Sequence, residues 1–414
     1  MLFLKDFIYN AHLKMKGRFP MKRFLSCLVS LVLLLLALMP AALAEDTVPT
    51  LQFGDQEDFK VLIIADTQDT SAPQMQMIHM IENALDRETP DLVILLGDNI
   101  HGPSISDKAD LEKALHFVLD PICARNIPFA FVYGNHDDQC GISREDQMKI
   151  YQEYPGCLAI EGEDLPGCGN YCVTVGIPEK PDSVYALYLL DSGTVSADGT
   201  GYGCVTAEQT AWMLENDKQL KETYANVASF AFQHIPVPKV YDLIEDAPAS
   251  APGAFTSVLS ISGDWHVAKE GALRAGRFGE YPCASVEDSG EFDAWKQMGL
   301  KAAFTGHDHL NDFVGTVEGI DLIGTTGAGF YLYGRGEDHG VRVLTLSKES
   351  FGEYDTSMLY YPELTDEPMP GFFAPTLGIM IRGYVLIGLA VILVLAVGIT
   401  FAVKALRKHR KAKA

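Results

Sequence analysis

The sequence predicts an α/β domain, and three observations lead to this fold class. Short runs of β-branched and aliphatic residues at 59–65, 91–97 and 127–134 are almost continuously apolar, which is typical of strands buried on both faces. Longer stretches with a helical period lie between these runs. Hydrophobic residues form 48% of the 414 residues, which is enough for a sizeable core.

The elements are expected in a regular strand–helix order. A strand over 59–65 precedes an amphipathic helix over 74–87, and a second strand over 91–97 precedes a helix near 107–119. This alternation continues into the strand at 127–134 and predicts parallel strands joined by helices. Further strands are expected at 184–191, 227–232, 301–305 and 341–347, with a hairpin over 312–324.

Two segments interrupt this order. Residues 236–290 are rich in Pro, Gly, Ser and Ala, and long loops in compact domains are often lids or binding loops. Residues 353–375 are acidic and rich in Pro, which predicts a tether over 353–380. The globular domain is therefore expected over 45–352.

The amino-terminal residues 1–44 have the features of a secretory signal peptide. Lys22 and Arg23 precede a long apolar run, and small residues in an Ala-x-Ala arrangement lie directly before Glu45. Met21 is then a candidate for the true start. A retained membrane helix is the alternative, but the small-residue end favours cleavage.

A second apolar segment lies near the carboxyl terminus. Residues 383–403 contain no charge and would span about 32 Å as a helix, which matches a bilayer core. We therefore expect a single transmembrane helix over 381–403. The tail at 404–414 is strongly basic and should lie in the cytoplasm, which places the domain at 45–352 outside the cell membrane.

The charge of the chain restricts its partners. The net charge is −23, and since residues 1–44, Arg382 and the basic tail together carry +12, the remainder carries −35. An exterior this acidic repels nucleic acid and anionic lipid surfaces, so no nucleic-acid binding is expected. A phosphate-bearing substrate would need local positive charge, and a metal ion could supply it.

Seven cysteines remain after cleavage of a signal peptide, so they cannot all pair within the chain. Export permits disulfides, for example among Cys157, Cys168 and Cys172, but the sequence does not settle the pairing. A zinc site at the Cys168–Cys172 spacing is the other interpretation.

Side chains that bind metals or carry protons follow five of the predicted strands. These candidates are Asp66, Gln68, Asp98, Asn135, His136, Asp137, His234, His307 and His309. Each alone could belong to an ordinary turn or be a hydrogen-bonded core histidine. Because ligands bind beyond the carboxyl ends of strands in α/β sheets, all five groups are expected on one rim. The mixture of carboxylate, amide and imidazole suits a pair of divalent first-row metals.

In these residues the sequence resembles the calcineurin-like metallophosphoesterases. That family has the ordered pattern DxH, GD, GNH(D/E), H and GHxH, and the resemblance covers about residues 60–350. The stretches "GHDHLNDF", "QHIPVP" and "LYLLDSG" are most similar to the purple-acid-phosphatase-like branch. The resemblance implies a layered β-sheet sandwich flanked by helices. It is specific for the family but much less so for the substrate.

The resemblance also implies roles for the individual residues. Two divalent ions (Mn, Fe or Zn) would activate a bridging hydroxide. One ion would be held by Asp66, Gln68, Asp98 and His309, and the other by Asp98, Asn135, His234 and His307. Asp98 would thus bridge the ions. His136 would protonate the leaving oxygen, and Asp137 would orient its ring.

The chain departs from the family pattern at two positions. Gln68 stands where the family usually has histidine, and an amide oxygen is a harder and weaker ligand than imidazole. His101 stands three residues after Asp98, where true purple acid phosphatases have a metal-binding tyrosine. One hypothesis is that His101 supplies the nitrogen that Gln68 lacks, and the alternative is a surface-loop residue.

These inferences predict a membrane-tethered, extracytoplasmic metal-dependent phosphohydrolase, most simply a phosphomonoesterase. Its substrate would be a small phosphate ester or a phosphorylated group at a surface. A phosphodiesterase with the same metal centre is one alternative. A surface receptor that binds metal without catalysis is the other.

Overall fold

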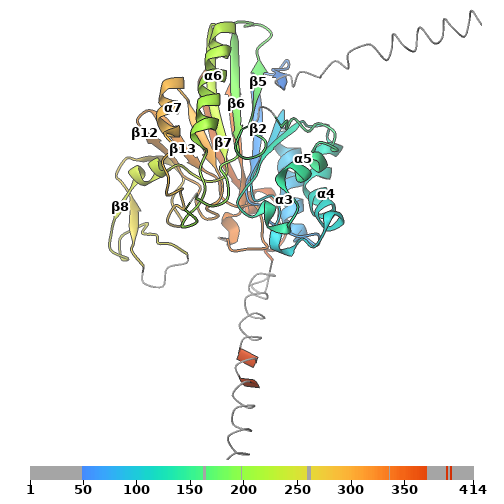
Figure 1. The fold of residues 1–414 in the computed structure, drawn as a ribbon, viewed down its shortest axis with the longest axis vertical. Coiled ribbons are helices and arrows are strands. Elements are labelled where there is room, and N and C mark those ends of the chain that lie inside the picture. Colours follow the sequence, from blue (N-terminus) through green and yellow to red (C-terminus); the bar gives the residue numbers. More distant parts are fainter. Residues whose placement is uncertain are drawn as a thin grey trace, which may run out of the picture. The chain divides into compact units, whose positions relative to one another are not determined.

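The computed structural model describes residues 49–161, 165–196, 198–258, 263–334 and 336–370, together with 388–389 and 392–393. Over residues 49–370 it contains two β-sheets packed against each other, with helices on their outer sides (Figure 1). This confirms the predicted α/β sandwich flanked by helices. The predicted signal peptide at 1–44 and the basic tail at 404–414 lie outside the described residues.

The first sheet has five strands in the order β15-β14-β2-β3-β4. Its strands are β2 (Asp58–Ile64), β3 (Leu92–Leu96), β4 (Phe129–Val132), β14 (Gly340–Ser347) and β15 (Tyr354–Tyr360). β2, β3 and β4 run parallel, as the strand–helix alternation predicts. The helices on this side are α3 (Met75–Glu88), α4 (Lys108–Ala124) and α5 (Arg144–Tyr151) (Figure 1).

The second sheet has eight strands in the order β1-β5-β6-β7-β11-β13-β12-β10. Its strands are β1 (Thr50–Gln52), β5 (Tyr171–Gly176), β6 (Ser183–Leu190), β7 (Asn226–Gln233), β10 (Leu273–Ala275), β11 (Ala302–Thr305), β12 (Val314–Val317) and β13 (Ile320–Gly324). Figure 1 shows α6 (Ala207–Thr223) and α7 (Glu291–Met298) beside this sheet. The neighbours β6, β7 and β11 run parallel. β5 runs antiparallel to β6 and parallel to β1, and β12 runs antiparallel to β13.

The burial of both faces of β6 explains why its sequence is apolar from Val184 to Leu190. Tyr185, Leu187 and Leu189 belong to the core that the two sheets share. The alternate residues Tyr188 and Leu190 belong to a second core, which includes Met213 of α6 and Trp295 of α7. A strand buried on both faces has no polar side, so its hydrophobic pattern is continuous.

The predicted tether is partly wrong. Tyr354–Tyr360 forms β15, which pairs antiparallel with β14, and the short helix α8 (Tyr361–Leu364) follows. Two alternate residues of β15, Asp355 and Ser357, are exposed. Exposed polar residues on an edge strand give a sequence pattern similar to that of a linker. The Leu364 carbonyl accepts a hydrogen bond from Asn83 of α3. The folded domain therefore extends beyond residue 352.

The excursion, defined as residues 236–290, contains a 3₁₀ helix (Pro238–Leu243) and the small sheet of β8 (Ile244–Asp246) and β9 (His266–Ala268). It also supplies β10 to the edge of the eight-stranded sheet. The segment therefore carries regular structure and is not a simple loop.

The seven cysteines of the described residues are free thiols. Cys168 packs in the core between the sheets, whereas Cys172 packs in the core beneath α6 and α7. Two thiols that face different cores cannot share a metal ion, so the zinc-site interpretation is wrong.

Within the part of the chain that the structure describes, no helix is both long enough and apolar enough to cross a bilayer. The segment predicted to do so, 381–403, falls outside the described residues except for four positions.

The assignment of β15 to the domain can be tested by substitution. Leu359 is 6% exposed and belongs to the larger hydrophobic core. We expect Leu359→Ala to lower the free energy of unfolding by about 2–4 kcal/mol, because the substitution leaves a cavity. Ser357→Ala, at an exposed position of the same strand, is the matched control and should change it by less than ~0.5 kcal/mol. Denaturation in urea measures the free energy of unfolding of both variants. Two equally small effects would support the interpretation of this segment as a tether.

Candidate metal centre

The predicted ligands come from strand ends in both sheets. Asp66, Asp98 and Asn135 follow β2, β3 and β4 of the first sheet, whereas His234 and His307 follow β7 and β11 of the second. The site therefore lies where the carboxyl ends of two sheets meet, rather than on the rim of one sheet. Single ligand atoms of Asp98, His234 and His307 lie within 4.8 Å of one another.

Short distances join the remaining ligands to this group. Nε2 of His234 is 3.3 Å from Oδ2 of Asp98 and 3.9 Å from Oδ1 of Asp66. Nε2 of His309 is 3.5 Å from the same Asp66 oxygen. The amide of Gln68 donates to Oδ2 of Asp98 at 3.0 Å. Residues separated by more than two hundred positions in the chain thus form one buried cluster.

Asn135 reaches the cluster through the turn that follows β4. The backbone N–H of His136 donates to Oδ1 of Asp98 at 2.8 Å. A Cβ atom at Gly134 would lie 2.2 Å from the Asp98 backbone nitrogen, so only glycine permits this approach. Asn135 lies between these two anchors and is 6% exposed.

The backbone at the cluster is strained. Asp66, Gln68, Asp98 and His307 have φ angles of 49°, 34°, 48° and 70°. They are four of the seven non-glycine residues with positive φ among the described residues. Each such residue costs on the order of 1–3 kcal/mol and persists only where surrounding contacts enforce it, which is common at functional sites.

Five polar atoms of the cluster are buried without a hydrogen-bond partner. These atoms are Asp66 Oδ1, Gln68 Oε1, Asn135 Oδ1, His234 Nε2 and His307 Nε2. Buried polar atoms normally have partners, because an unpaired one costs about 1–3 kcal/mol. All five belong to predicted ligands, and oxygen and imidazole nitrogen are donors that divalent first-row metals accept. The residues present therefore fit a metal centre.

Two backbone carbonyls orient the histidines. Nδ1 of His234 lies 3.0 Å from the Leu96 carbonyl oxygen, and Nδ1 of His309 lies 2.9 Å from that of Tyr333. Each carbonyl can accept an Nδ1 proton and leave Nε2 as the coordinating atom. Burial lowers the pKa of His309 to about 4 and that of His307 well below its usual value. Both imidazoles are therefore neutral at pH 7, which is the form that binds metal.

Burial and neighbouring charges shift the pKa values of the two aspartates in opposite directions. Burial raises the pKa of Asp66 well above its usual value. Burial also acts to raise the pKa of Asp98, but the neighbouring His234 outweighs it and the pKa is lowered. For His234, burial is outweighed by Asp98 and Asp66, and the pKa rises to about 10. The buried carboxylates thus attract positive charge at this point.

The predicted partnership of His136 and Asp137 is not observed. The Asp137 carboxylate points into the protein and accepts hydrogen bonds from the backbone N–H groups of Gly134 (2.7 Å) and Ile100 (3.1 Å). Nδ1 of His136 instead lies 2.8 Å from Oε1 of Gln139. Residues 137–140 form a 3₁₀ turn that brings Gln139 back over the His136 ring. Asp137 therefore fixes the loop, and Gln139 orients the imidazole.

His101 lies at the edge of the site, and its contacts there involve Nδ1 and the ring. Its Nδ1 is 2.7 Å from the Ser104 hydroxyl, and its ring centroid is 4.9 Å from that of Tyr331. The Ser104 and Tyr331 hydroxyls are 3.1 Å apart. The hypothesis that His101 replaces the missing histidine nitrogen thus finds no support in these contacts.

Sequence reasoning missed several residues that surround the ligands. The ring of Tyr333 stacks on His309 with centroids 4.4 Å apart, and its hydroxyl donates to the buried carboxyl of Glu280 at 3.2 Å. The ring of Tyr202 meets His307 edge-on at 4.3 Å. Neither tyrosine lies in a recognisable motif, and each depends on a loop whose position the sequence does not reveal.

The excursion is fixed to the loop that carries His307 and His309. The Asn311 side-chain oxygen accepts hydrogen bonds from the backbone N–H groups of Gly279 and Glu280 at 2.8 and 3.0 Å. An Asp308 carboxylate oxygen accepts from the Cys283 N–H at 3.0 Å. This arrangement explains the polar residues of "GHDHLND" that are not ligands.

A buried ion pair supports the loop after β4. Arg144 of α5 pairs with Asp191, which follows β6, and also donates to the Gly134 carbonyl at 2.8 Å. Its guanidinium reaches the Thr194 hydroxyl at 2.9 Å. The "LYLLDSG" stretch is thus tied to the loop that carries Asn135 and His136.

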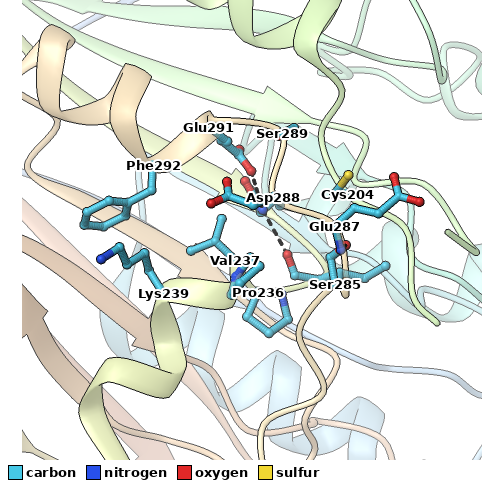
Figure 2. Close-up of a pocket in the computed structure, with 13 residues that line it drawn as sticks. Cys204, Pro236, Val237, Lys239, Ser285, Glu287, Asp288, Ser289, Glu291 and Phe292 are labelled. Atoms are coloured by element: carbon cyan, nitrogen blue, oxygen red, sulfur yellow. Dashed lines mark hydrogen bonds between the residues drawn. The ribbon is translucent and has the colours of Figure 1, made fainter. Parts of the chain in front are cut away.

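Figure 2 shows a pocket that begins directly after His234 in the chain. Its walls come from Ile235–Lys239 and Ser285–Phe292, and it includes Cys204 and Gln233. Burial raises the pKa of Glu291 to about 8. The amine of Lys239 is already paired with Asp242 (2.9 Å) and Glu318 (3.1 Å). This acidic pocket is unsuited to a phosphoryl group.

Comparisons with known proteins show the family to which the chain belongs. Residues 59–311 match the family Calcineurin-like phosphoesterase. The chain is 27% identical over 342 residues to "Probable inactive purple acid phosphatase 14" of Arabidopsis thaliana, which covers 72% of this chain and 79% of that protein. It is 28% identical over 242 residues to "Phosphatase DCR2" of Saccharomyces cerevisiae, covering 56% of this chain and 38% of that protein.

Among solved structures, a dimetal phosphatase from Danio rerio is similar with a TM-score of 0.42 at 16% identity, covering 73% of this chain and 99% of that one. The family match spans more than half of the sequence, as the ordered motifs predict. This protein belongs to the calcineurin-like phosphoesterase family.

Proposed function

We propose that this protein is a phosphomonoesterase that uses two divalent metal ions. The observation that carries the proposal is the set of five unpaired, buried donor atoms that converge where the two sheets meet. Family membership supports a phosphoester as the substrate class. The substrate would be a small phosphate ester or a phosphorylated group at a surface.

The ligand sets that we propose follow from motif position and from the contacts described above. One ion (Mn, Fe or Zn) would be held by Asp66, Gln68, Asp98 and His309, and the other by Asp98, Asn135, His234 and His307. When bound, the ions supply positive charge for the phosphoryl oxygens and lower the pKa of water. Asp98 would bridge them, since it contacts Gln68 on one side and His234 on the other.

His136 is the proton donor that we propose for the leaving group. It follows Asn135 directly, and its ring is partly exposed. The Gln139 oxygen accepts from Nδ1, so Nε2 is left to give its proton to the leaving oxygen. After that transfer the neutral ring keeps its Nδ1–H, which Gln139 continues to hold.

One alternative is a surface receptor that binds metal without catalysis. Gln68 favours it, because an amide is a weaker ligand than imidazole. The Arabidopsis relative, which is named a probable inactive phosphatase, favours it as well. His136 favours catalysis, because metal binding alone requires no proton donor beside Asn135. A phosphodiesterase with the same centre is the other alternative.

We expect the purified full-length protein, loaded with Mn²⁺, Fe²⁺ or Zn²⁺, to hydrolyse p-nitrophenyl phosphate faster than bis(p-nitrophenyl) phosphate. A chelator should abolish turnover. His136→Ala should lower kcat by about 10²-fold or more, because the leaving oxygen loses its acid, while metal content measured by mass spectrometry stays the same.

The control is His116→Ala. His116 is an exposed histidine on α4 that pairs with Asp120, and its loss should leave kcat unchanged. Turnover that survives both chelation and His136→Ala would refute the mechanism. Metal binding without any turnover would favour the receptor, and faster cleavage of the diester would favour a phosphodiesterase.

We also propose that the domain is exported and anchored by a helix over 381–403. The support is the pattern of the sequence: an Ala-x-Ala site before Glu45, and an uncharged segment followed by a basic tail. The mature chain should begin at Glu45 by mass spectrometry, and it should remain in the membrane fraction after a carbonate wash. An intact amino terminus together with release by carbonate would contradict both parts.

A further inference from the structure

We propose that the metal centre opens onto an apolar ledge, formed by Val195, Tyr202 and Val286, that selects phosphomonoesters with an apolar alcohol group. The inference rests on the proposed function, since it assigns a substrate class to the same site. Aryl and arylalkyl phosphates belong to this class. Sugar and glycerol phosphates do not.

Tyr202 connects the ledge to the ligands. Its ring meets His307 edge-on with centroids 4.3 Å apart, and a ligand atom of His307 is within 4.8 Å of ligand atoms of Asp98 and His234. The ring is therefore separated from the donor atoms by one imidazole. A phosphoryl group bound there would place its alcohol portion within reach of this loop.

The two valines lie beside Tyr202. Val195 forms a β-bridge with Tyr202, and the Ser285 hydroxyl donates to the Tyr202 carbonyl at 3.2 Å. A Cβ atom at Gly201 would lie 2.7 Å from a methyl group of Val286, so this valine packs directly on the neighbouring backbone. Two loops that are distant in the sequence thus meet at Gly201 and Tyr202.

The valine side chains of the ledge are largely exposed to solvent. Val195 and Val286 are 56% and 63% exposed. Tyr333, which stacks on the other ligand histidine, is 40% exposed. Within residues 49–370 these are three of the five exposed large hydrophobic residues that the structure describes. Exposed apolar groups that gather at a polar site indicate a binding surface.

The surrounding charge argues against a second anionic group on the substrate. Glu287 and Asp288 follow Val286 in the wall of the acidic pocket (Figure 2), and the whole chain carries −23. The negative potential does not repel an uncharged apolar group, and burial of the exposed valines beneath such a group would stabilise the complex. The ledge therefore fits an uncharged, apolar alcohol portion.

Binding of phosphonates tests the ledge without turnover. The full-length, Mn²⁺-loaded protein is titrated by calorimetry with 2-phenylethylphosphonate and 2-hydroxyethylphosphonate, which carry the same charge. We expect the phenyl compound to bind about 10-fold more tightly, a typical discrimination for a modest apolar contact. In the double variant Val195→Ser/Val286→Ser the two Kd values should approach each other.

Val258→Ser is the matched control, because Val258 is an exposed valine (46%) in the loop between β8 and β9, and the preference should persist in this variant. Equal Kd values in the wild type, or a preference that survives the double substitution, would overturn the ledge even if p-nitrophenyl phosphate is hydrolysed. A ledge-dependent preference without any hydrolysis would support the ledge and refute the proposed function.

Discussion

The rest of the structure depends on one constraint, which is the burial of unpaired ligand atoms around Asp98. One oxygen of Asp98 accepts the N–H of His136, and the other lies between Gln68 and His234. Five buried ligand atoms of the cluster have no hydrogen-bond partner. Burying charge in this way is costly unless an opposite charge is provided. A pair of cations would provide it, since among the described residues no Lys or Arg forms an ion pair with Asp66 or Asp98.

The scaffold enforces this unfavourable arrangement by rigid means. Parallel strands from two sheets end at the same place, so the ligands are attached to elements whose positions are fixed by the shared core. Left-handed backbone at Asp66, Asp98 and His307 turns each side chain inward immediately after its strand. Two further contacts hold the remaining segments. One is the ion pair of Arg144 with Asp191, and the other joins the excursion to the loop that carries His307. Strain at the centre is thus balanced by packing around it.

The sequence predicts those features that depend on local patterns. Strand ends and their ligands are visible because a buried strand is continuously apolar and the polar residue that follows is conspicuous. The layered sandwich is predicted by the family resemblance alone, because the pattern of a strand does not reveal its partner. Gln139 could not be preferred to Asp137 as the partner of His136, since that choice depends on a 3₁₀ turn. Tyr202 and Tyr333 depend on long-range loop packing and carry no local signal, whereas β15 has one exposed face and resembled a linker.

The central claim is that two cations share Asp98, and metal stoichiometry tests it most directly. Full-length wild-type protein, Asp98→Ala and Asn135→Ala would each be loaded with Mn²⁺, desalted and analysed by mass spectrometry for bound metal. The account predicts about two ions per chain for the wild type, close to none without the bridge, and about one when only Asn135 is lost. A wild type that retains no metal, or an Asp98→Ala variant that binds as much as the wild type, would contradict it.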